Sequence, residues 1–202
     1  MALQTSGQIT LQDIATEFGG SAPHGLTEYY GAAAGIPASG EISIQDFYGA
    51  SANTGLITVT EGSSSYTTGG KFPSTIKCAG YAIDATETTI QGGFAPPTGA
   101  IGSISPTTYN GVAVEALVLA TSSYVGPRFL VNMQGNRAQS FFTSVTPQGG
   151  NTLTSASATH TYSSSGNYTQ WYWDDNVGET VVLGAGIEAQ WDGTGTSTVQ
   201  FT

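Results

Sequence analysis

The sequence is short of positive charge, and this shortage excludes several classes of partner. Its 202 residues contain four lysines and arginines against fourteen aspartates and glutamates, which gives a net charge of −10. Proteins that bind nucleic acid neutralise phosphates with several cations, and anionic membranes attract basic segments in the same way. Neither a nucleic acid nor a membrane surface is therefore expected as a partner.

Charged residues as a whole are also scarce. They make up 9% of the chain, against about 25% in an average soluble domain. Disordered chains are highly charged and poor in aromatic residues, whereas 10% of this chain is aromatic. The composition therefore predicts a folded protein whose surface consists largely of Thr, Ser, Asn, Gln and Gly. Such a surface suits β-structure and packing against other protein.

Cysteine and histidine are too few for most metal and catalytic sites. Cys78 is the only cysteine, so no intrachain disulfide can form, and a buried, unreactive thiol is expected. The histidines, His24 and His160, are far apart in the sequence, which disfavours zinc. Neither lies beside a Gly-x-Ser-x-Gly motif, and no spacing singles out two acids as a glycosidase pair. A non-enzymatic protein without cofactor or metal is predicted.

Long apolar runs are absent as well. No stretch approaches the roughly 20 apolar residues of a membrane-spanning helix. The N-terminus does not resemble a signal peptide. We therefore expect a protein that is made in a cytoplasm and is not inserted into a membrane.

An internal repeat lies in the N-terminal part of the chain. Residues 6–14 and 39–47 both read Ser-Gly-x-Ile-Ser/Thr-aliphatic-Gln-Asp-apolar. Alternation at the start of each copy is typical of a short strand or turn. The Ser/Thr before Gln-Asp resembles a helix N-cap with an acid in the first turn. We expect each copy to lead into a short helix, the first with Ile14 and Phe18 on one face and its end at Gly19.

The N-terminal segment, residues 1–50, is small for an independent fold. A second short helix is predicted at residues 26–34, but so few large apolar side chains would make the segment marginally stable alone. We therefore predict that it packs against the rest of the chain, a symmetry mate or another protein. The candidate docking contacts are Ile14, Phe18, Tyr29, Tyr30, Phe47 and Tyr48.

A small, uncharged linker at residues 51–55 precedes a β domain at residues 56–202. Short alternating stretches are separated by turns, with Asn110-Gly111 as the strongest hairpin signal. This spacing favours an antiparallel β-sandwich or jelly roll, so the fold class is mostly β after an N-terminal segment of short helices and strands. The expected strands are residues 56–60, 71–82, 111–119, 128–134, 170–173 and 179–183, with final strands at Trp191 and at residues 199–201.

Aromatic residues near the C-terminus are the candidate ligand-binding residues. Alternation along a strand would place Trp171 and Trp173 on one face of a sheet and Tyr172 on the other. Two interpretations stay open: packing in the core, or an exposed platform for a sugar or protein, since aromatic residues often dominate binding. The candidates for such a platform are Tyr168, Trp171, Trp173 and Trp191.

An oxygen-rich cluster follows the same stretch. Asp174, Asp175 and Asn176 are close to Glu179 in the sequence, but their spacing is not that of an EF-hand loop. A solvated turn and a bound cation would both fit. The sequence therefore leaves open whether Asp174, Asp175 and Glu179 hold an ion.

Several motifs resemble proteins of tailed bacteriophages. They are Ile-Thr-Leu-Gln-Asp-Ile-Ala-Thr-Glu-Phe-Gly-Gly-Ser (9–21), Leu-Thr-Glu-Tyr-Tyr (26–30), Gly-Ile-Pro (35–37) and Ile-Ser-Ile-Gln-Asp-Phe-Tyr-Gly (42–49). They are similar to the N-terminal segments of tail-fibre-like and other virion proteins, especially in phages of marine bacteria and cyanobacteria. Residues 103–110 and 135–150 resemble β domains found in such proteins.

The resemblance implies a non-enzymatic structural protein that is located on the virion after synthesis in the host cytoplasm. The first expectation is a tail-fibre or tail-tip attachment module whose β domain binds a host surface glycan or protein. Its partners would be other virion proteins and itself, as a homo-oligomer for which a trimer is expected. The alternative is a capsid decoration (cement) or head-fibre protein. A free carbohydrate-binding or carbohydrate-degrading protein is the third hypothesis.

Overall fold

A computed structural model shows the fold, and it describes residues 3–20, 22–33, 36–37, 39–50, 55–67, 75–83, 100–122, 126–175 and 181–202. The chain divides into two compact units, one taking in residues 1–54 and the other nearly all of residues 55–202. Except for Gly55, the predicted linker at residues 51–55 lies outside the described residues. Across the described ranges, no helix is long and apolar enough to cross a membrane.

The first unit is built from short helices, α1 (Leu11–Phe18) and the 3₁₀ helices η1 (Leu26–Tyr29) and η2 (Ile44–Phe47). Both copies of the repeat begin their helix with a capping box. The Thr10 N–H donates to Asp13 Oδ2 at 2.8 Å, and the Asp13 N–H donates to Thr10 Oγ1 at 3.2 Å. In the second copy the Ser43 N–H donates to Asp46 Oδ2 at 2.7 Å. The predicted N-caps are thus confirmed.

The ends of these helices agree only partly with the predictions. The N–H of Gly19, whose φ is +78°, donates to Ala15 O at 2.9 Å and closes α1 as predicted. The second predicted helix is shorter than residues 26–34, because η1 stops at Tyr29. The residues before α1 and η2 are bends and coil, so no strand begins either copy of the repeat.

A cluster of aromatic rings forms the centre of the first unit. Phe18, Tyr29 and Phe47 lie with ring centroids 6.0 to 6.1 Å apart in tilted or edge-to-face arrangements, a favourable geometry for aromatic pairs. The buried members of this core are Ile9, Ile14, Ala15, Tyr29, Ile36, Phe47 and Ala50. The first unit therefore has an apolar core of its own.

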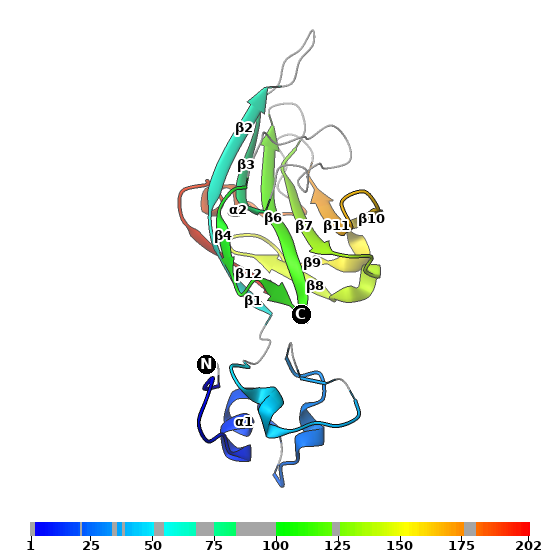
Figure 1. Ribbon diagram of the computed structural model, residues 1–202. Coiled ribbons are helices and arrows are strands. Elements are labelled where there is room, and N and C mark those ends of the chain that lie inside the picture. Colours follow the sequence, from blue (N-terminus) through cyan, green and yellow to red (C-terminus); the bar gives the residue numbers. More distant parts are fainter. Residues whose placement is uncertain are drawn as a thin grey trace. The chain divides into compact units, whose positions relative to one another are not determined.

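The second unit is a β-sandwich of two antiparallel sheets (Figure 1). The smaller sheet has the strand order β4-β1-β12-β8-β9, and the larger sheet has the order β10-β11-β7-β6-β3-β2, with β5 paired to β6. The smaller sheet contains β1 (Leu56–Thr60), β4 (Ser103–Ser105), β8 (Ser144–Pro147), β9 (Leu153–Thr154) and β12 (Thr196–Phe201). The larger sheet contains β2 (Gly62–Thr67), β3 (Thr75–Ala82), β5 (Thr108–Tyr109), β6 (Val112–Ser122), β7 (Arg128–Gln134), β10 (Thr159–Ser163) and β11 (Tyr168–Asp174). Short helices η3 (Gln139–Phe141), η4 (Ser155–Ser157) and α2 (Ile187–Gln190) lie between strands along the chain.

The predicted fold class, mostly β with an antiparallel sandwich, is confirmed. β1 and β7 have the predicted bounds, and β3, β6, β11 and β12 overlap the strands predicted for them. The predicted turn at Asn110-Gly111 joins β5 to β6. Its φ values of +48° and +73° are those of a type I′ hairpin turn, which both residue types tolerate.

Two strand predictions near the C-terminus are wrong. Residues 181–183 of the predicted strand 179–183 form a turn, and the rest of it lies outside the described residues. The physical reason is Asp175, whose carboxylate accepts the N–H groups of Val182 and Leu183 at 2.7 and 2.8 Å. These donors are then not available to a neighbouring strand. Trp191 does not lie in a strand either, because it follows α2 directly.

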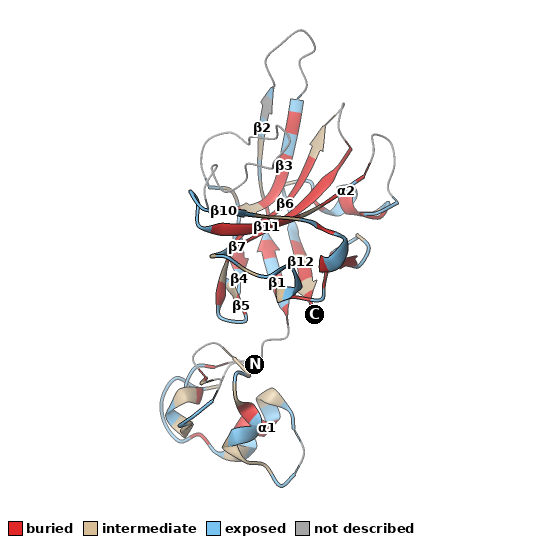
Figure 2. Cartoon of the chain, turned by 90° about the vertical axis from the view of Figure 1, so that its right-hand side faces the viewer, coloured by how far each residue is buried: buried red, intermediate tan, exposed pale blue. Residues whose placement is uncertain are grey.

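The central strands β6 and β7 of the larger sheet are buried on both faces, and they are largely red in Figure 2. On one face the ring of Phe142 lies 5.0 Å from Trp171 of β11 and 5.3 Å from Phe201 of β12, which joins the two sheets. On the other face, Val118 and Leu130 belong to a second apolar cluster. This double burial explains why β6 and β7 are nearly continuous apolar runs, without clean alternation.

Candidate functional site

The predicted aromatic platform is buried, so the core-packing interpretation holds and the exposed platform is wrong. Trp171 is fully buried, Trp173 and Trp191 are each 3% exposed, and Tyr168 is 7% exposed. The indole N–H of Trp171 donates to Gln139 O at 3.1 Å, and that of Trp173 donates to Thr154 O at 3.0 Å. Both rings pack against Phe142, which confirms that they share a face of the sheet.

The predicted docking residues of the first unit fall into two groups. Ile14, Tyr29 and Phe47 are buried in the core of the unit, with Phe18 half-buried against them, so they are not available as docking contacts. That part of the prediction is wrong because the unit buries its own rings. Tyr30 and Tyr48 are accessible, and their hydroxyls donate to the carbonyls of Gly40 and Gly7. These two remain candidate docking contacts.

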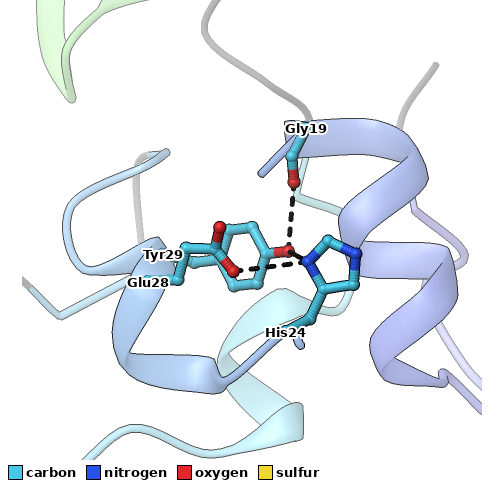
Figure 3. A network of polar contacts seen from close by, with 4 residues as sticks. All are labelled: Gly19, His24, Glu28 and Tyr29. Carbon is cyan, nitrogen blue, oxygen red and sulfur yellow. Dashed lines mark hydrogen bonds and ion pairs between the residues drawn. The ribbon is translucent and has the colours of Figure 1, made fainter. Parts of the chain in front are cut away.

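A polar network fixes the loop between α1 and η1 (Figure 3). The Tyr29 hydroxyl donates to Gly19 O at 3.1 Å, and the Nδ1 atom of His24 lies 3.2 Å from this hydroxyl and 3.3 Å from Glu28 Oε2. Gly19 O can only accept, so Tyr29 donates to it, and a proton on His24 Nδ1 would then lie between the Tyr29 and Glu28 oxygens. Burial and the Glu28 carboxylate raise the pKa of Tyr29, so its hydroxyl keeps the proton that this arrangement needs. His24 therefore has a structural role here.

The acids of the predicted oxygen-rich cluster have protein partners. Asp174 forms a salt bridge with Arg128, whose Nη2 donates to Asp174 Oδ2 at 3.1 Å. Asp175 accepts the two backbone N–H groups of the turn at residues 181–183. Glu179 lies outside the described residues, and within the described part of the chain no group of three or more His, Cys, Asp or Glu could hold a metal ion.

A cleft of about 490 Å³ opens on the second unit, between the larger sheet and the segment that runs from α2 to Asp192. We call it the Trp191 cleft. Strands β2, β3 and β6 form one side of it, and Glu188 to Asp192 form the other. Its lining residues are Ser63, Ser64, Ser65, Lys77, Cys78, Ala79, Leu119, Thr121, Glu188, Trp191 and Asp192.

Strand register brings the polar residues of the cleft together. In the antiparallel ladders, Lys77 of β3 is opposite Ser65 of β2 on one side and Thr121 of β6 on the other. Two residues further along the same face, Ala79 is opposite Leu119, and both side chains are buried. The sheet thus presents an ammonium group flanked by hydroxyls, next to an apolar floor.

A buried carboxylate holds the opposite side of the cleft in place. Glu61, 8% exposed, accepts the Gly193 N–H at 2.8 Å and the Ser197 hydroxyl at 2.5 Å, and its own N–H donates to Gly195 O at 2.9 Å. Gly193 has φ +87°, and a Cβ atom there would lie 2.4 Å from the Cβ of Ser63. Only glycine allows the turn to approach β2 this closely.

Trp191 and Asp192 are fixed by neighbours outside the cleft. The Trp191 indole N–H donates to Gln148 O at 3.2 Å, and its ring meets Phe129 edge-to-face at 5.3 Å. Asp192 Oδ1 accepts the N–H and the hydroxyl of Thr194 at 2.8 and 2.6 Å, and these bonds lower the pKa of Asp192. Asp192 is therefore a carboxylate at neutral pH.

The chemistry of the cleft is that of hydrogen bonding. Lys77 supplies a cation, Glu188 and Asp192 supply carboxylates, and the strands supply hydroxyls. Burial raises the pKa of the Cys78 thiol to about 11, so it is protonated and a poor nucleophile. His160 lies elsewhere, with its ring 5.2 Å from Trp171 and its Nε2 3.1 Å from Arg137 O. The arrangement is suited to recognising a polar ligand.

Comparison with known proteins gives no relative. No family model matches the chain, and no curated protein or solved structure matches it. The resemblance of residues 9–49 to phage virion proteins therefore remains an expectation from the sequence motifs.

Of the residues that line the cleft, only Trp191 is among the ligand contacts that the sequence predicts. Ser63 and Ser65 lie in a strand of small polar residues with no apolar alternation, so that strand was not predicted. The available signal was the alternation in β3, which places Lys77 on the face opposite to Cys78. That pattern alone does not indicate which side chains lie across from Lys77.

Proposed function

We propose that this chain is a non-enzymatic structural protein of a bacteriophage virion, of the tail-fibre or tail-tip attachment type. The first unit would dock onto other virion proteins, and the second unit would present the Trp191 cleft to the host surface. The sequence motifs support the location on the virion. The observation that carries the binding role is the cleft, a preformed polar site on a unit with its own core.

Binding without covalent chemistry is the mechanism that this proposal implies. The ligand would be held by shape and hydrogen bonds to residues already fixed by the fold, which lowers the entropic cost of binding. Weak single sites become effective when several copies act together, because linked sites bind at a high effective concentration. We therefore propose a homo-oligomer, with a trimer as the expected form. Sedimentation at micromolar concentration tests this, and a clean monomer would contradict it.

The location is tested by labelling purified virions with a gold-conjugated antibody against the chain and imaging them by electron microscopy. Gold confined to the tail end is the expected result. Gold spread over the head at hundreds of copies would replace the attachment role with the alternative, a capsid decoration or head-fibre protein. Virions that carry none of the chain would contradict both and favour a free carbohydrate-binding protein.

A further inference from the structure

We propose that the Trp191 cleft binds a neutral saccharide, an inference that rests on the proposed function, in which the second unit faces the host surface. The ligand class follows from the size, the charge balance and the rigidity of the cleft. Its volume of about 490 Å³ lies within the range of small-molecule sites in proteins. It therefore has room for a short saccharide.

The polar groups on the two sides of the cleft are complementary to sugar hydroxyls. The Lys77 ammonium only donates hydrogen bonds, and the carboxylates of Glu188 and Asp192 only accept them. A sugar hydroxyl both donates and accepts, so adjacent hydroxyls can bridge from the ammonium on β3 to the carboxylates across the cleft. The hydroxyls of Ser65 and Thr121 beside Lys77 add groups that can do either.

The charge balance selects against anionic ligands. One ammonium stands against two carboxylates in the cleft, and the whole chain has a net charge of −10. A phosphate or a uronic acid would gain one cation and meet two anions, whereas a neutral sugar meets no like charge. Ala79, Leu119 and Trp191 also line the cleft, but they are only 8%, 1% and 3% exposed, so the polar groups supply the contacts to the ligand.

The far side of the cleft is held before any ligand arrives. Glu61 binds both Gly193 and Ser197, and Gly193 lies directly against Ser63 of β2. The turn that carries Asp192 is therefore fixed relative to the strand that carries Ser65. A preformed site of this kind loses little conformational entropy on binding.

The test is a binding experiment with the full chain and a defined panel of sugars. The panel contains glucose, galactose, N-acetylglucosamine and N-acetylgalactosamine, with glucuronic acid and galacturonic acid as charged partners of the two hexoses. Saturation-transfer NMR detects contact, and titration gives the affinity. We expect saturable binding of at least one neutral sugar with a Kd of about 1 mM, as for small polar ligands. The uronic acids should bind at least about tenfold more weakly, because a carboxylate group faces Glu188 and Asp192.

Substitutions in the cleft test whether it is the binding site. Lys77→Ala and Asp192→Asn should each weaken the neutral sugar about tenfold, the effect of losing a hydrogen bond to a charged group. Thr121→Ala should weaken it less, and Thr159→Ala, on an exposed position of β10 in the same sheet, should leave it unchanged. Circular dichroism confirms that each variant is folded.

Three outcomes would overturn the inference: no saturable binding by any sugar of the panel, equal or tighter binding of the uronic acids, or full affinity in the folded Lys77→Ala and Asp192→Asn variants. These results are independent of where the chain is located. Sugar binding by a chain absent from virions would uphold this inference and overturn the proposed function. A chain found at the tail end with no sugar binding would uphold the proposed location and overturn the inference that the cleft binds a neutral saccharide.

Discussion

The two units bury their aromatic residues in different ways. In the first unit, Phe18, Tyr29 and Phe47 form one small cluster, and two of the helices that carry them, α1 and η2, are capped by residues three positions apart. In the second unit, Trp171 meets Phe142, which in turn meets Phe201 of the other sheet. The rings of the first unit thus form one closed cluster, whereas those of the second unit connect two sheets. Because each unit has a core of its own, damage to one core should leave the other folded.

The largest expected effect is at Trp171. Trp171→Ala removes a fully buried ring that contacts Phe142 and donates to Gln139, which should lower the free energy of unfolding of the second unit by about 3–5 kcal/mol. Denaturant unfolding followed by circular dichroism measures the loss. Hydrogen exchange of α1 amides should stay unchanged, and a loss below about 1 kcal/mol would mean that the ring is not a central part of the core.

Phe47→Ala is the matching change in the first unit. It opens the centre of the aromatic cluster and should cost about 3 kcal/mol. Because so small a unit has little stability to lose, we expect α1 and η2 to exchange their amide protons rapidly. Amides of β6 and β7 should remain as protected as in the unmodified chain. Loss of protection in both units together would contradict independent cores.

Glu61 holds the turn at Gly193 against the sandwich, and its substitution should cause an intermediate loss in the free energy of unfolding. Glu61→Gln turns the amide donor toward Ser197, whose hydroxyl keeps Gln190 O as its acceptor, and it replaces the charged acceptor of the Gly193 N–H by a neutral one. The expected loss is about 1–3 kcal/mol, in the second unit alone. Glu41→Gln, an exposed change in the first unit, is the control and should leave stability unchanged. Equal stability of the Glu61 and Glu41 variants would show that the hydrogen bonds of Glu61 to Gly193 and Ser197 do not stabilise the second unit.

The smallest effect concerns a matched pair of aspartates, one in each unit. The hydroxyl and then the N–H of a threonine lower the pKa of Asp13 and of Asp192 below the ordinary value of 3.8. Since the pKa is lowered on folding, the stabilisation is fully present above the ordinary value and is lost as the pH falls through the lowered one. NMR titration of the side-chain carboxyl carbons should find both pKa values below 3.8. Ordinary values in the folded chain would contradict the hydrogen bonds.

The parts of the fold that sequence patterns predict are those whose causes are local. The caps of α1 and η2 depend on residues three apart, and the Asn110-Gly111 turn depends on the φ values of its two residues. Alternation correctly placed Trp171 and Trp173 on one face, but it does not tell whether that face is covered. Phe142, in the segment before β8, covers it, and no pattern in β11 indicates this.

The cleft could not be predicted for a related reason. Lys77 lies opposite Ser65 and Thr121 because of the register of three strands. Asp192, on the other side of the cleft, is more than a hundred residues after Lys77 in the chain. Its approach depends on Glu61 and on the missing side chain of Gly193. The site depends on which strands pair and in which register, and the sequence pattern of a single strand does not reveal this.

The central claim is that the second unit attaches a phage particle to its host through the Trp191 cleft. The most direct test adds the purified full chain to host cells before the phage whose virions carry it, and counts the particles that adsorb. The unmodified chain should block adsorption by competing for the receptor, and folded Lys77→Ala should not. If neither protein blocks adsorption, or both block it equally, the claim that the cleft makes the attachment is contradicted.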